Sequence, residues 1–262
     1  MRRFLAVLGT LCFCFAAGSA SAAMVADKIS YSLGSTNFEG YLVYDDSVSA
    51  KRPAILMAPN FMGPTQNAIT KAKLLAGKKY VYFILDIYGV NIRPKAYKEA
   101  VAAMGVLVKD VPTQRARANK ALDVFLAEAG KRNLIDADKI AAIGFCFGGA
   151  NVLELVRAGR NVRGIVSFHG TLKTPNPADA KNIKAKVLVL HGAVDPVVPK
   201  ADRDALESEL TAAGVDYQIV AFSDTYHSFT NPEAKAAKQS IYDAKVTRRA
   251  YAMMEDFFAE IF

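Results

Sequence analysis

The sequence Gly-Phe-Cys-Phe-Gly-Gly at positions 144–149 decides which fold the chain is expected to have. It follows an apolar stretch at residues 140–143, typical of a buried strand, and precedes a helical pattern at residues 148–158. Glycines on both sides of a central residue permit the sharp strand-to-helix turn called a nucleophile elbow. Such a turn raises Cys146 above the sheet and aims a helix N-terminus at it, which favours a thiolate and a developing oxyanion. The alternative is an inert cysteine packed in the core.

Outward from this motif, apolar stretches of strand length alternate with helical patterns. The expected strands are residues 28–33, 38–44, 54–57, 81–85, 140–143, 163–168, 186–190 and 217–222, and the expected helices are 65–75, 96–108, 112–129, 148–158, 200–213 and 233–262. Apolar strands separated by helices predict an α/β fold with a mostly parallel central sheet and helices on both faces. Ligands of such sheets bind at the carboxyl ends of the strands. Because no repeat or linker interrupts the pattern, residues 23–262 are expected to form a single domain.

The first 22 residues have the layout of a secretory signal peptide. Arg2 and Arg3 precede a stretch at residues 4–17 without a charge, and small residues then lead to an expected cleavage after Ala22. The stretch is shorter than the roughly 20 residues that span a bilayer, so stable membrane insertion is not expected. The sequence therefore predicts export, with the mature protein periplasmic or secreted.

Composition narrows the function of the mature chain. The whole chain is 52% hydrophobic and 22% charged, which is ordinary for a globular protein and excludes disordered, collagen-like and coiled-coil classes. Removing Arg2 and Arg3 leaves 31 basic and 25 acidic residues, a net charge of +6, with no run of more than two adjacent basic residues. This dispersed charge argues against a nucleic-acid partner. Cysteines 12 and 14 leave with the signal peptide, so Cys146 has no disulfide partner and is either buried or reactive.

Two further strand ends carry partners for Cys146. Asp195 lies in His-Gly-Ala-Val-Asp-Pro-Val-Val-Pro at 191–199, and His227 lies in Ser-Asp-Thr-Tyr-His-Ser-Phe at 223–229. The chain order of nucleophile, acid and histidine is that of the α/β-hydrolase fold. We therefore expect a catalytic triad of Cys146, Asp195 and His227.

Three other residues compete for these roles. His169 and His191 are alternative bases, and Asp224 is an alternative acid, although its closeness to His227 in the sequence favours a turn role. The three histidines are far apart and are not joined by cysteines or acids at ligand spacing, so no metal site is expected.

These motifs together resemble the dienelactone hydrolase family of α/β-hydrolases. Besides the three motifs around Cys146, Asp195 and His227, the segment Asp-Ile-Tyr-Gly at 86–89, with Arg93 beyond it, is similar to a loop of that family. The resemblance covers the chain from about residue 38 onward. It implies hydrolysis of a small-molecule ester or lactone through a thioacyl intermediate, without a cofactor. It implies nothing about the oligomeric state.

The chain also departs from the founding enzymes of that family. Asn60 stands where those enzymes carry a glutamate that helps to activate the thiol, so His227 is expected to activate Cys146 directly. Asn231 stands where they carry an arginine that holds a substrate carboxylate. Dienelactone itself is therefore not the expected substrate, and neutral esters or lactones are preferred over anionic ones.

The remaining site residues follow from the expected loops. The backbone N–H groups of Phe147 and Phe61 are expected to form the oxyanion hole. The residues expected to line the substrate pocket are Asn60, Tyr88, Arg93 and Phe229. An alternative is an exported protein that keeps the fold without turnover, either as a binding protein or as a sensor that oxidises Cys146. Ester turnover separates the enzyme from both alternatives.

Overall fold

A computed structural model describes residues 24–262, and the expected signal peptide at residues 1–22 lies outside this range. The strands are β1 (Met24–Leu33), β2 (Thr36–Asp45), β3 (Arg52–Ala58), β4 (Val81–Ile84), β5 (Ile135–Phe145), β6 (Gly164–Phe168), β7 (Lys186–Gly192), β8 (Tyr217–Phe222), β9 (Lys235–Ala236) and β10 (Ser240–Ile241). The helices are α1 (Gln66–Ala76), α2 (Tyr97–Val108), α3 (Val111–Lys131), α4 (Phe147–Arg157), α5 (Lys200–Ala212) and α6 (Ala244–Ile261), with a 3₁₀ turn, η1, at Pro177–Asn182. None of the helices within residues 24–262 is long and apolar enough to cross a membrane.

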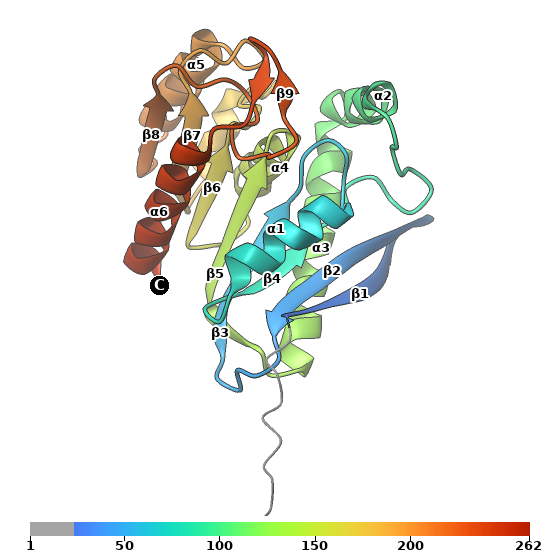
Figure 1. Ribbon diagram of the computed structural model, residues 1–262. Coiled ribbons are helices and arrows are strands. Elements are labelled where there is room, and N and C mark those ends of the chain that lie inside the picture. The colour runs from blue at the N-terminus through green and yellow to red at the C-terminus, as the bar shows by residue number, and fades with distance from the viewer. Residues whose placement is uncertain (1–23) are drawn as a thin grey trace, which may run out of the picture.

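Eight strands form one twisted sheet in the order β1-β2-β4-β3-β5-β6-β7-β8 (Figure 1). The strands β1 and β2 pair antiparallel with each other, and β2 pairs antiparallel with β4. All pairs from β4 to β8 are parallel, so that their carboxyl ends lie along one edge of the sheet. The predicted α/β-hydrolase fold, with a mostly parallel sheet, is confirmed.

Helices cover both faces of the sheet because each strand of its centre is apolar on both sides. The helices α1 and α6 pack against one face, where Ile69 and Met254 join one hydrophobic core. The helices α3, α4 and α5 pack against the other face, where Phe125, Val152 and Leu206 join a second core. Figure 1 shows α1 and α6 in front of the sheet and α3 and α4 behind it.

The C-terminal segment differs from the expected continuous helix. Residues 235–241 form the short β9–β10 hairpin, and α6 begins only at Ala244, where the Asp243 side chain accepts a hydrogen bond from Val246 N–H. Ala, Lys and Gln residues in this segment favour a helix locally. Tertiary contacts override that preference, since Ile241 N–H donates to the carbonyl oxygen of His227. The hairpin therefore lies against the loop that carries His227.

Candidate active site

Cys146 occupies the sharp turn between β5 and α4. Its backbone has a φ of 55° and a ψ of −118°, a strained conformation for a residue other than glycine. A Cβ on Gly144 would lie 2.0 Å from the Gly148 carbonyl oxygen, and a Cβ on Gly148 would lie 2.0 Å from the Ala58 carbonyl oxygen. Both positions therefore require glycine, and the turn holds Cys146 at the carboxyl edge of the sheet.

Cys146, His227 and Asp195 form a continuous chain of polar contacts. The Sγ atom of Cys146 lies 3.1 Å from Nε2 of His227, and Nδ1 of His227 lies 2.7 Å from Oδ2 of Asp195. The other carboxylate oxygen of Asp195 accepts hydrogen bonds from Val197 N–H at 2.8 Å and Val198 N–H at 3.0 Å. Asp195 and His227 are buried, whereas Cys146 is only partly buried. Loops after β5, β7 and β8 thus bring the three residues together.

The electrostatics of this chain favour a charged histidine. Burial by itself lowers the pKa of His227, but the charge of Cys146 and the hydrogen bond to Asp195 outweigh burial and raise the pKa to about 10. Nδ1 of His227 carries its proton toward Asp195, so Nε2 faces the sulfur. The arrangement can therefore hold His227 as an imidazolium up to about pH 10, with Nε2 directed at the sulfur of Cys146.

The competing residues have other partners. Nε2 of His191 lies 2.9 Å from the Val198 carbonyl oxygen, and burial lowers the pKa of His191, so it supports the Asp195 loop as a neutral group. His169 has its Nε2 atom 2.8 Å from the Thr230 hydroxyl, and its ring meets that of His227 edge to face at 5.2 Å. Burial, followed by repulsion from His227, keeps the pKa of His169 well below its usual range. Asp224 is exposed in a turn with a φ of 52°.

Two backbone N–H groups beside Cys146 have no acceptor in the described part of the chain, those of Phe61 and Phe147. The turn that presents Phe61 is held by Asn60, whose side-chain oxygen accepts from Met62 N–H at 3.0 Å. The Tyr88 hydroxyl donates to the Phe61 carbonyl oxygen at 2.9 Å, and the Tyr88 ring stacks on Phe147. These contacts hold the turn at Phe61 and the ring of Phe147, the two residues whose N–H groups are expected to form an oxyanion hole.

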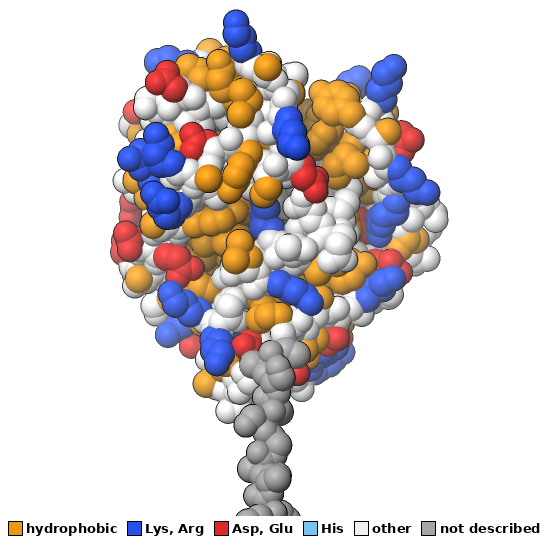
Figure 2. All heavy atoms as spheres, viewed as in Figure 1, with side chains coloured by type: hydrophobic (Ala, Val, Ile, Leu, Met, Phe, Trp, Pro, Cys, Tyr) orange, Lys and Arg blue, Asp and Glu red, His pale blue; other side chains and the backbone are white. Residues whose placement is uncertain are grey.

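A cleft of about 430 Å³ opens at the Cys146–His227 contact. The residues that line it are Asn60, Phe61, Tyr97, Val101, Met104, Cys146, Thr171, Val197, His227, Ser228, Asn231, Glu233, Ala234, Lys235, Ala236, Gln239 and Ser240. They come from α2, from the loops after β3, β5, β6, β7 and β8, and from the β9–β10 hairpin. Figure 2 shows apolar side chains on the α2 side of a depression between the α2 and β9 ends of the molecule. A cleft of this size suits a small organic molecule.

Three residues expected in the pocket lie elsewhere. Arg93 forms a salt bridge of 2.7 Å with the buried Asp86, and its other guanidinium nitrogen donates to the Gly89 carbonyl oxygen. Tyr88 contacts Phe61 and Phe147, and Phe229 is fully buried against the edge of His169. Each of the three side chains points into the protein from its loop, which the position in the sequence does not reveal. Only Asn60 of the expected pocket residues lines the cleft.

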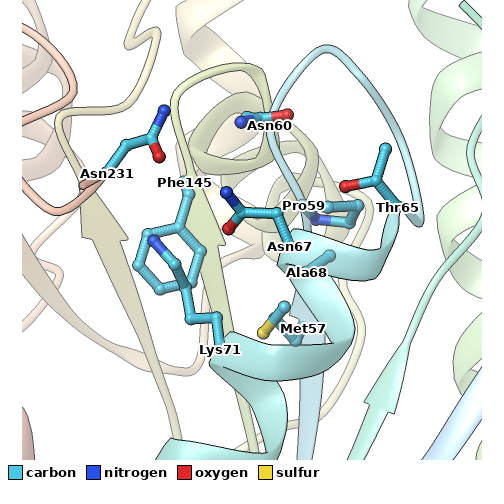
Figure 3. A pocket seen from close by; sticks show the side chains of 9 residues that line it. All are labelled: Met57, Pro59, Asn60, Thr65, Asn67, Ala68, Lys71, Phe145 and Asn231. Carbon is cyan, nitrogen blue, oxygen red and sulfur yellow. The ribbon is translucent and has the colours of Figure 1, made fainter. Parts of the chain in front are cut away.

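A second, polar cavity of about 20 Å³ lies beside the cleft and shares Asn60 and Asn231 with it. Figure 3 shows Lys71 reaching from α1 across the ring of Phe145 toward this cavity. The ammonium group lies 4.1 Å from the ring centre and donates to the carbonyl and hydroxyl oxygens of Thr230. Burial lowers the pKa of Lys71 to about 8. Lys71 thus ties α1 to the His227 loop.

Sequence reasoning missed Lys71 and the walls formed by α2 and the hairpin. Lys71 sits in a helix with Lys73 close by, and lysines on helices are usually solvated. The spacing of Lys71 from the buried Ala68 and Ala72 could have indicated its burial, because this spacing places Lys71 near the buried stripe of α1.

A mostly parallel sheet with a nucleophile elbow, and with an acid and a histidine on loops after two later strands, defines a hydrolase of the α/β-hydrolase class. A model of the dienelactone hydrolase family matches residues 38–262. The chain belongs to the dienelactone hydrolase family, and it is accordingly a hydrolase of the ester or lactone type.

Solved structures support the same assignment. The structure of m3DLH is 36% identical to this chain, covers 92% of it and 99% of its own chain, and has a TM-score of 0.85. The dienelactone hydrolase-like promiscuous phosphotriesterase P91, from metagenomic libraries, is 34% identical, with 92% and 100% coverage and a TM-score of 0.85. The uncharacterized protein K02A2.1 of Caenorhabditis elegans is 32% identical over 135 residues, which are 49% of this chain and 84% of that protein.

Proposed function

We propose that this protein hydrolyses carboxylic esters or lactones through a Cys146–His227–Asp195 triad and a thioacyl-enzyme intermediate. The observation that carries the proposal is the unbroken contact chain from Sγ of Cys146 to the buried carboxylate of Asp195 at a nucleophile elbow. The thiolate is the reactive form of cysteine, and an adjacent imidazolium is the arrangement that activates it.

In the first half of the reaction, the Cys146 thiolate attacks the carbonyl carbon and the carbonyl π electrons move to the oxygen. The N–H groups of Phe61 and Phe147 donate to this oxyanion. When the tetrahedral adduct collapses, the bond to the alcohol oxygen breaks and His227 gives that oxygen its Nε2 proton. The products are a thioester on Cys146, a free alcohol and a neutral His227.

In the second half, water attacks the thioester while Nε2 of His227 accepts one of its protons. The oxyanion forms again between Phe61 and Phe147, and its collapse expels the Cys146 thiolate and releases the acid. His227 is then an imidazolium again, paired with the thiolate. Asp195 stabilises that imidazolium and keeps the Nδ1 proton in place throughout.

The test is turnover of an ester and lactone panel by residues 23–262, run beside Cys146→Ala. The panel includes a neutral aryl phosphotriester, because the similar protein P91 is described as a promiscuous phosphotriesterase. We expect turnover of esters by the wild type, loss of turnover in Cys146→Ala, and a thioester adduct on Cys146 in rapidly quenched samples. Ester turnover that survives in Cys146→Ala would contradict the proposed nucleophile. Reaction of Cys146 with peroxide but not with any ester would favour the redox-sensing alternative.

We also propose that the protein is exported and cleaved after Ala22. The proposal rests on the charged start, the uncharged stretch at residues 4–17 and the small residues before Ala22. When residues 1–262 are expressed in a bacterium, the protein recovered from the periplasm should have the mass of a chain that begins at Ala23. Recovery in the cytoplasm of a chain that still begins at Met1 would contradict this proposal.

A further inference from the structure

One face of α2 presents apolar side chains to the cleft. Tyr97, Val101 and Met104 are spaced at i, i+4 and i+7, which places them on one side of the helix, and all three line the cleft. Ala100 and Leu107, on an adjacent side, are the buried residues that attach α2 to the body. Tyr97 is 65% exposed and Val101 is 38% exposed, so this apolar stripe is only partly covered by the described chain.

The chemistry of the proposed reaction orients the substrate in the cleft. His227 must give a proton to the leaving oxygen, so the alcohol part lies on the His227 side, near Ser228 and Ser240. The carbonyl oxygen points at the N–H of Phe61. The acyl part then extends away from His227, toward α2. The Phe61 ring joins the oxyanion loop to this helix, because it meets Tyr97 edge to face at 5.6 Å.

We propose that the stripe of Tyr97, Val101 and Met104 is the acyl-binding subsite, and that it makes the enzyme select esters of extended apolar acids over acetates. This inference rests on the proposed ester hydrolysis and adds the class of acid. An apolar acyl chain would cover side chains that otherwise face water. The cleft volume of about 430 Å³ limits the length of chain that can be covered.

The gain per carbon follows from the hydrophobic effect. A buried methylene contributes about 0.8 kcal/mol, which is roughly a fourfold rise in kcat/KM for each carbon that enters the subsite. We expect kcat/KM to rise from acetate to hexanoate in this way. For the dodecanoate ester, kcat/KM should be lower than for the hexanoate ester, because the longer chain exceeds the space in the cleft.

The test uses 4-nitrophenyl esters of straight-chain acids with wild type, Val101→Phe and Val101→Ala. The matched control is Val106→Phe, since Val106 is on the same helix, is 69% exposed and does not line the cleft. We expect Val101→Phe to lower the hexanoate-to-acetate ratio of kcat/KM at least tenfold, and Val101→Ala to move the optimum to a longer chain. The control should keep the wild-type ratio. Equal ratios in all four proteins would overturn the inference.

Two further measurements separate the subsite from the chemistry. The first measurement uses butyrate esters with alcohols of increasing length. The kcat/KM of Val101→Phe and that of the wild type should depend on alcohol length in the same way. A selective loss for long alcohols in Val101→Phe would place the alcohol, not the acyl chain, on α2.

The second measurement uses alkyl bromomethyl ketones, which alkylate a thiol without being hydrolysed. Their rate of reaction with Cys146 should show the same dependence on alkyl length as ester hydrolysis. If no ester is turned over but this dependence is retained, the proposed function fails and the apolar subsite stands. If esters are turned over without any chain-length preference, the subsite fails and the function stands.

Discussion

Replacing Asp195 by asparagine should reverse the proton arrangement of His227 without changing the shape of the site. In the wild type, one carboxylate oxygen of Asp195 accepts from Val197 and Val198 N–H, and the other contacts His227 at 2.7 Å. Asparagine can keep only its carbonyl oxygen on the two backbone N–H groups. Its NH₂ group then faces Nδ1 of His227 and donates to it, which moves the imidazole proton to Nε2.

The size of the effect follows from what is lost. A hydrogen bond to a charged group contributes about 1.5–3 kcal/mol, so kcat/KM should fall roughly 10- to 150-fold in Asp195→Asn at neutral pH. His227→Ala should lose more, because it removes both the base and the acid. The hydrogen bond to Asp195 is one cause of the raised pKa of His227, so the alkaline limb of kcat/KM should move to lower pH in Asp195→Asn.

The assay is the pH dependence of aryl ester hydrolysis between pH 6 and 10, with denaturation midpoints measured on the same samples. Asp224→Asn is the control, since Asp224 is exposed and should leave activity unchanged. Activity of Asp195→Asn within about threefold of wild type, at normal stability, would refute the role of Asp195. A comparable loss in Asp224→Asn would transfer that role to Asp224.

Three other outcomes are expected. Arg157→Met should lower the free energy of unfolding by about 3–5 kcal/mol in urea denaturation, because it leaves the carboxylate of Glu209 buried without its partner. The control is Arg160→Met, at an exposed ion pair, which should lower the free energy of unfolding by less than about 1 kcal/mol. Equal losses in the two variants would contradict the role of the buried pair. Because the folded-state pKa of His227 is raised to about 10, its stabilisation is complete below its ordinary pKa of about 6.5 and is lost as pH rises through about 10. The difference in free energy of unfolding between wild type and His227→Gln should therefore shrink across that window, and a constant difference would be evidence against the ion pair. A neutral ester should have a higher kcat/KM than a carboxylate-bearing analogue of equal size, and the reverse preference would indicate that Lys235, at the cleft, binds the anion.

Much of the site could be predicted because the main chain determines it. The glycines around Cys146 follow from a turn that has no room for a Cβ, and Asp195 and His227 follow from the rule that parallel strands end at one edge. Cys146, Asp195 and His227 therefore needed no knowledge of side-chain packing. The pocket residues did need it. Tyr88 and Arg93 sit on the expected loop, but their side chains turn inward, to the Phe61 carbonyl and to Asp86.

The hairpin at residues 235–241 could not be predicted from local sequence preferences, for a related physical reason. Its sequence favours a helix, but the pairing of β9 with β10 and the hydrogen bond from Ile241 N–H to the His227 carbonyl oxygen hold it extended. The same holds for Lys71, whose position on Thr230 depends on how α1 packs beside the His227 loop. Interactions between residues far apart in sequence decide both features.

In the proposed mechanism, reactivity and selectivity therefore depend on different parts of this molecule. Cys146 and its partners are carried by the edge of the central sheet, where strain and burial leave little freedom for substitution. The walls of the cleft are carried by α2 and by the β9–β10 hairpin, which lie outside the sheet and whose lining side chains are partly exposed. A substitution at Val101 changes the space beside the carbonyl group but none of the contacts among Cys146, His227 and Asp195. Changes in the range of acids accepted should thus be obtained on α2 at little cost in stability, whereas changes at the elbow should affect folding and chemistry together.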